Sequence, residues 1–210
     1  NDFTKTLEAM GRSLPRPRAI LAISAHWITN DTKITSHASP KTIHDFFGFP
    51  EELYQLYYPA PGWPQLAFQI AQTLALNNIL IRPTQEWGLD HGTWIPFKHM
   101  YPEANIPILQ LSINIDQSLD FHFKLGEALK FLREQEVLIV GSGNIVHNLE
   151  MMNWTGPSSA HSWATEFESW VIEHLNKKHY TPLIFGMKQH PAADLSVPTL
   201  DHYLPLLYVL

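Results

Sequence analysis

Short apolar runs alternate along this chain with longer segments of helical periodicity, and this alternation restricts the fold more than any other feature. The apolar runs, which predict buried strands, lie at 18–24, 78–82, 106–113, 136–143 and 182–186. The helical segments lie at 3–13, 64–76, 91–100, 118–133 and 162–177. Strands that alternate with helices form sheets covered on both faces. The sequence therefore predicts an α/β fold, a single domain with a central mostly parallel or mixed sheet flanked by helices.

The composition fits one domain and excludes several classes of partner. The chain has 210 residues, of which 45% are hydrophobic, and a net charge of −6, which argues against a nucleic-acid-binding surface. No apolar run approaches the about 18–20 residues needed to cross a bilayer, and no signal-peptide pattern is visible. We therefore expect no membrane insertion and a cytoplasmic location. Because cysteine is absent, a bound metal would need imidazole, carboxylate or water ligands.

Five of the 12 histidines lie where predicted strands give way to loops, or in loops rich in aromatic residues. They are His26, His44, His91, His147 and His202. In open α/β sheets the carboxyl ends of strands line the ligand crevice, so we expect several of these rings to converge there. Taken singly, His26 or His202 would more often be a hydrogen-bonded structural histidine. The joint pattern favours a site, because imidazole is the commonest metal ligand in proteins.

The other histidines are assigned no chemistry, since their polar or helical surroundings favour solvated or capping roles. They are His37, His99, His122, His161, His174, His179 and His190. The stretch "GSGN" (141–144) matches neither common phosphate-binding glycine motif, and the flanks of Ser142 differ from a nucleophile elbow. A phosphate loop and a serine hydrolase are therefore poor explanations of this sequence.

Several stretches resemble the class III extradiol ring-cleaving dioxygenases, and within them the 4,5-DOPA dioxygenase-like branch. The matching stretches are "LPRPRAILAISAHW" (14–27), "TIHDFFGFPEELYQLYYPAPG" (42–62), "WGLDHGTWIPFKHMYPEANIPILQLSI" (87–113), "GSGNIVHNL" (141–149) and "LDHYLPLLYVL" (200–210). They span most of the chain in the family's order. The resemblance implies cleavage of a catechol ring, such as that of DOPA, with O₂ at a non-haem Fe(II), although Zn(II) is often found in purified members.

The resemblance also implies roles for the five histidines. His26 and His202 would be metal ligands, with His202 in the place where related subfamilies use a glutamate. His147 would be the acid/base residue beside the metal, sometimes counted with the ligands. His91 and His44 would face the catechol and the oxygen. Trp27, Phe46, Phe47 and Trp94 are candidates for apolar walls or plain core.

The family's first ligand lies in a G-H-G-S-P motif that follows an initial strand, and this motif does not occur in the chain. We therefore expect residues 1–210 to form one catalytic domain that lacks this N-terminal strand and the family's C-terminal end. One further histidine ligand is expected upstream of Asn1.

Two other functions fit the same residues. A zinc-dependent hydrolase can also use three histidines and a water, and a metal-binding protein could keep the scaffold without catalysis. The sequence leaves open which catechol is bound and whether the protein is a monomer or a dimer.

Overall fold

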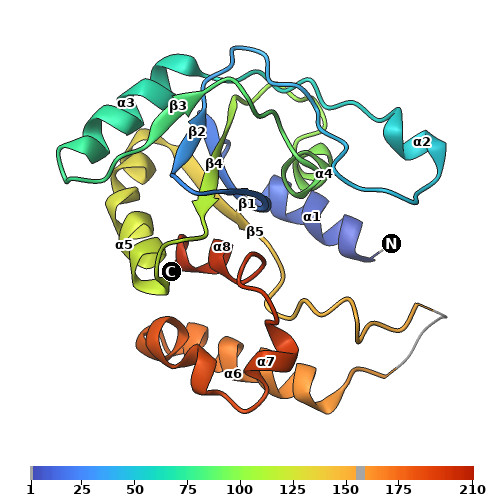
Figure 1. The fold of residues 1–210 in the computed structure, drawn as a ribbon. Helices are drawn as coiled ribbons and strands as arrows, with labels where there is room; N and C mark the ends of the chain where they lie inside the picture. The colour runs from blue at the N-terminus through green and yellow to red at the C-terminus, as the bar shows by residue number, and fades with distance from the viewer. Residues whose placement is uncertain (1, 155–158) are drawn as a thin grey trace.

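A five-stranded mixed sheet with the strand order β3-β2-β4-β1-β5 forms the centre of the computed structural model, which describes residues 2–154 and 159–210 (Figure 1). The strands are β1 (Ala19–Thr29), β2 (Lys33–Thr35), β3 (Arg82–Thr84), β4 (Ile108–Asn114) and β5 (Val137–Ser142). β1 pairs in parallel with both β4 and β5, and β2 joins β4 antiparallel. The predicted α/β class with a mixed sheet is confirmed.

Helices cover both faces of this sheet. They are α1 (Asp2–Ser13), α2 (Glu51–Tyr54), α3 (Pro64–Ala75), α4 (His91–Met100), α5 (Leu119–Ala128), α6 (Ser162–Asn176), α7 (Ala193–Ser196) and α8 (Leu204–Leu207). α1 packs on α4, which packs on β1, while α3 packs on β2 and β3 and α8 packs on β5. α6 packs against α7 and against the turn at Pro182–Gly186, which contacts α5.

The central strand β1 divides its side chains between two cores. Leu21 and Ile23 are buried with residues of α3, α5, α6 and α8, whereas Ile20 and Ala22 are buried with residues of α4. Successive residues of a strand point to opposite faces, so this all-apolar run can supply both cores at once. β1 is consequently fixed from both sides, and its carboxyl end is a rigid place from which to present side chains.

Most predicted elements are present, and three differ in type or extent. The run 182–186 is not a strand but a π-helical turn, which begins at Pro182 and buries Leu183 and Ile184. Short apolar runs are compatible with either structure, and here helical packing prevails. The strand predicted at 78–82 lies instead at Arg82–Thr84. The helix predicted at 118–133 ends at Ala128, and a 3-10 helix follows at Lys130–Gln135.

Within the described residues, no helix has the length and apolar character that crossing a membrane would require.

His122 was expected to be solvated or capping, and this prediction is wrong. Its side chain on α5 is fully buried, and its Nδ1 lies 2.7 Å from the hydroxyl of Tyr208. Burial disfavours the charged ring and lowers the pKa of His122 to about 4.

This burial predicts a pH dependence of stability. An unfolded histidine has a pKa near 6.5, so between pH 6.5 and 4 His122 is protonated in the unfolded chain but neutral in the folded protein. The free energy of unfolding should therefore fall as the pH falls through this window. Between pH 7 and pH 4.5 the free energy of unfolding of His122→Gln should fall by about 2 kcal/mol less than that of the parent protein. Urea unfolding at the two pH values measures this difference.

Exposed His179 provides the matched control, since His179→Gln should keep the parent pH dependence. Equal pH dependence in His122→Gln and the parent protein would show that His122 does not titrate as its burial requires.

Candidate metal and catalytic centre

A break in the ladder between β1 and β4 places His26. Ile23 pairs with Leu111 and Ile28 pairs with Ile113, so the partners lie five positions apart on β1 but only two on β4. Pairing of β1 with β5 ends at Ser24. The residues between, including His26, are thus released from the regular ladder. Bulges of this kind commonly redirect side chains next to active sites.

His91 is the first residue of α4, and a buried cap fixes this helix end. The side chain of Asp90 accepts a hydrogen bond from the backbone N–H of Thr93 at 3.1 Å, which satisfies one free donor of the first turn. Asp90 also accepts hydrogen bonds from Gln110 and, at 3.3 Å, from Trp87. Burial raises the pKa of Asp90 in spite of hydrogen bonds from Ser24 and Gln110. The start of α4, and with it the backbone of His91, is therefore tied to β4.

His147 and His202 come from two further segments. His147 lies in the loop after β5, where its backbone N–H donates to the carbonyl of Ser196 at 2.8 Å. His202 lies in the turn that precedes α8. Their rings stack with centroids 3.5 Å apart and an interplanar angle of 12°. The two histidines thus form one side of the centre.

The structure brings together four of the five histidines singled out in the sequence. The ring centroid of His26 lies 3.9 Å from that of His91 and 5.1 Å from that of His202, which stacks on His147. The expected convergence at the carboxyl end of the sheet is therefore observed for these four. The joint pattern carried information that no single histidine did.

His44 lies beside the cluster. Its Nε2 is 2.8 Å from the carbonyl oxygen of Leu56, and its ring packs against Phe46, Tyr54 and Trp94. Phe46 also lies edge-on to His91, with centroids 5.6 Å apart, and so connects His44 to the cluster.

The four candidate aromatic residues have different surroundings. Phe46 borders the cluster through its contact with His91. Trp94 is buried in the core, and Trp27 is buried and stacks on Trp87. Phe47 is 89% exposed, so the alternative that it is a core residue is wrong.

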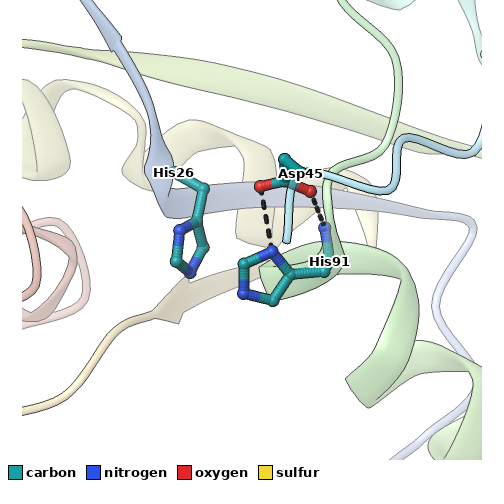
Figure 2. A group of neighbouring side chains, drawn as sticks. All are labelled: His26, Asp45 and His91. Carbon is teal, nitrogen blue, oxygen red and sulfur yellow. Dashed lines mark hydrogen bonds and ion pairs between the residues drawn. The ribbon is translucent and has the colours of Figure 1, made fainter. Parts of the chain in front are cut away.

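Asp45 is a site residue that the sequence analysis missed. Its Oδ1 accepts a hydrogen bond from the backbone N–H of His91 at 2.8 Å, and its Oδ2 lies 2.9 Å from Nδ1 of the same residue (Figure 2). His91 lies 46 positions away from Asp45 in the chain, so only the fold creates this pairing.

The electrostatics keep two of the imidazoles neutral. Burial, and then the neighbouring His91, lowers the pKa of His26. Burial, followed by His147 and His26, lowers the pKa of His202 to about 4. Near neutral pH both rings therefore carry a free nitrogen lone pair, which is the form that binds metals.

The donor set fits a divalent metal ion. Potential ligand atoms lie within 4.8 Å of one another in two groups, one of His26, Asp45 and His91 and the other of His147, Asp201 and His202. The buried Nδ1 of His202 has no hydrogen-bond partner in the described part of the chain. Neutral imidazoles with nearby carboxylates suit ions such as Fe(II) and Zn(II).

Comparison with known proteins identifies the family. Residues 2–202 match the model of the catalytic LigB subunit of aromatic ring-opening dioxygenase. The chain belongs to this family, the class III extradiol dioxygenases. The enzyme is thus an extradiol dioxygenase, and dioxygenases of this family depend on a metal.

The relatives agree with this assignment over most of the chain. The protein named 4,5-DOPA dioxygenase extradiol from Escherichia coli (strain K12) is 44% identical over 215 residues, which cover 100% of this chain and 78% of the relative. The protein of the same name from Beta vulgaris is 40% identical, over 91% of this chain and 71% of the relative. A crystal structure of an uncharacterized protein from Escherichia coli K12 superposes with a TM-score of 0.85 at 40% identity, covering 100% of this chain and 81% of the other.

A glycine allows α4 of this dioxygenase to approach β1. A Cβ atom on Gly92 would lie 2.5 Å from Oγ of Ser24 and 2.7 Å from Cδ2 of His26, closer than van der Waals contact permits. The first turn of α4 can therefore pack against the side chains of β1 only because position 92 is a glycine.

We predict that Gly92→Ala displaces the ring of His26 and weakens metal binding by at least about tenfold, as typical of disturbed support around a metal ligand. Isothermal titration of the metal-free dioxygenase with Zn(II) measures this change. Gly186→Ala is the control, because the nearest atom to a Cβ there is 3.7 Å away. Parent-like Zn(II) affinity in Gly92→Ala would mean that His26 is not held by this contact or does not bind metal.

Proposed function

We propose that this dioxygenase cleaves the ring of a DOPA-like catechol with O₂ at a non-haem Fe(II) site. The observation that carries the proposal is the convergence of His26, His91, His147 and His202 at the carboxyl end of β1 and β5. The names of the relatives from Escherichia coli and Beta vulgaris support a catechol of the DOPA type. Catechol and O₂ are therefore the proposed small-molecule partners.

In this proposal His26 and His202 hold the metal, and His147 lies beside them. Residues 1–210 are proposed to belong to one catalytic domain. Lowered pKa values of His26 and His202 support their role, because neutral imidazole is the ligand form. Bound Fe(II) supplies open coordination positions and electron transfer between catechol and O₂, whose direct reaction is spin-forbidden. Zn(II) would occupy the same ligands without this redox chemistry.

The remaining residues handle protons and the ring. His147 accepts a catechol proton and returns it during ring opening, a role for which imidazole is suited near neutral pH. His91, once its Nε2 has taken up a proton, donates a hydrogen bond to oxygen as negative charge develops there. Phe46, which contacts both His91 and His44, borders the space for an aromatic substrate. His44 is assigned a substrate contact at the edge of the site.

Replacing His147 separates proton transfer from metal binding. We expect His147→Ala to bind near-normal iron but to turn over about 10²-fold or more slowly, as is typical when a general acid/base is lost. Iron content and the initial rate of O₂ uptake give the two quantities. His179→Ala, at an exposed position, should match the parent enzyme.

His26→Ala should show the opposite defect, since loss of a ligand empties the site. Parent-like turnover in His147→Ala would remove His147 from the mechanism, and stoichiometric iron in His26→Ala would contradict the ligand assignment.

The function itself is tested by anaerobic Fe(II) reconstitution of the full-length protein, followed by L-DOPA in air. Stoichiometric O₂ uptake together with a yellow ring-opened product is the expected result. Tight Zn(II) binding without O₂ uptake for any catechol would overturn the proposal in favour of a zinc-dependent hydrolase or a metal-binding protein.

A further inference from the structure

We propose that Asp45 is the positioning residue of His91, which it holds in the Nδ1–H tautomer so that Nε2 is presented toward His26 and the bound substrate. The part that concerns substrate rests on the proposed function, whereas the tautomer and orientation are properties of the protein alone. Asp45 acts through His91 and is assigned no contact with substrate.

Two contacts from one carboxylate define the position of His91. Oδ1 of Asp45 accepts from the backbone N–H at 2.8 Å, and Oδ2 lies 2.9 Å from Nδ1 of the ring. The main chain is hydrogen-bonded to Asp45 and the ring lies at ion-pair distance from the same carboxylate, so rotation of the side chain is restricted. Figure 2 shows the result, in which the other ring nitrogen of His91 lies on the side toward His26.

The charge of Asp45 decides which ring nitrogen carries the proton. Burial would raise the pKa of Asp45, but the imidazole and backbone amide of His91 outweigh it and leave this pKa below its ordinary value. Asp45 is therefore ionised near neutral pH and can only accept hydrogen bonds. A ring nitrogen 2.9 Å away meets it favourably only as a donor, so neutral His91 keeps Nε2 as a free acceptor.

The backbone is built to bring Asp45 to His91. Ile43 donates its N–H to the carbonyl of Leu89 at 2.7 Å, and Leu89 donates to the carbonyl of Lys41 at 2.8 Å. A Cβ on Gly88 would lie 2.1 Å from the oxygen of Lys41, so the two segments approach as closely as glycine allows. The backbone segments that carry Asp45 and His91 are thus hydrogen-bonded to each other, and this pairing brings the two side chains into contact.

The neighbouring carboxylate does not compete for this role. Asp90 precedes His91 in sequence, but its side chain accepts from the backbone of Thr93 and from the side chains of Gln110 and Trp87. Asp90 therefore fixes the helix end, while Asp45 fixes the ring.

Asp45→Asn should change the tautomer of the His91 ring, an effect that is not expected if Asp45 only stabilises the fold. If the amide oxygen keeps the hydrogen bond from the backbone of His91, the amide N–H₂ group faces Nδ1, which must then act as an acceptor. The proton of the neutral ring should move to Nε2. Asp45→Glu retains a carboxylate and should preserve the Nδ1–H tautomer.

Long-range ¹H–¹⁵N spectra of the imidazoles in the full-length, metal-free protein at pH 8.5 report the tautomer, with His91 assigned from its absence in His91→Gln. We expect Nδ1–H in the parent and Asp45→Glu, and Nε2–H in Asp45→Asn. In the Fe(II)-loaded enzyme, kcat of Asp45→Asn should fall about 10- to 100-fold at unchanged iron content, with a smaller change in KM. The exposed ion-pair variant Asp120→Asn is the matched control and should equal the parent in both measurements.

Nε2–H in the parent protein, or an unchanged Nδ1–H signal in Asp45→Asn, would overturn the positioning role. If Asp45→Asn does not fold, the tautomer of the parent and of Asp45→Glu still decides the question. The expected tautomers in a protein that takes up no O₂ with any catechol would reject the proposed function but leave the inference about Asp45 standing.

Discussion

The interrupted pairing of β1 with β4 is the constraint on which the rest of the centre depends. Up to Ile23 the strand is hydrogen-bonded on both sides and supplies two cores, so its path is fixed. Pairing with β4 is interrupted between Ile23 and Ile28 and pairing with β5 ends at Ser24, so His26 lies in the interruption. In this interruption the ring of His26 meets the rings of His91 and His202.

Bringing four imidazoles together is costly unless their charges are suppressed. Burial lowers the pKa values of His26 and His202, and the neighbouring rings lower them further, so that mutual repulsion is avoided near neutral pH. The neutral rings of His26 and His202 have free lone pairs, and the buried Nδ1 of His202 has no hydrogen-bond partner among the described residues. Because the rings of His26 and His202 are neutral, they do not repel one another, and their lone pairs can bind a metal cation.

His91 differs from the other rings because one carboxylate contacts both its ring and its backbone. Asp45 and Asp90 act on the same residue from different directions, one on the ring and one on the helix end. Both carboxylates are supplied with hydrogen-bond donors, which offsets the cost of burying them. His91 is thus the most firmly oriented member of the cluster, as its proposed contact with substrate requires.

The sequence by itself determined the alternation of strands and helices, the bounds of α4 at 91–100 and the histidines that converge, because periodicity and strand ends are local properties. It could not distinguish the π-helical turn at Pro182–Gly186 from a strand, nor show that His122 is buried while Phe47 is exposed, because packing against distant segments decides these features. Only the tertiary structure revealed the release of His26 from the ladder and the pairing of Asp45 with His91. Both depend on contacts between residues far apart in the chain, whose register no local pattern encodes.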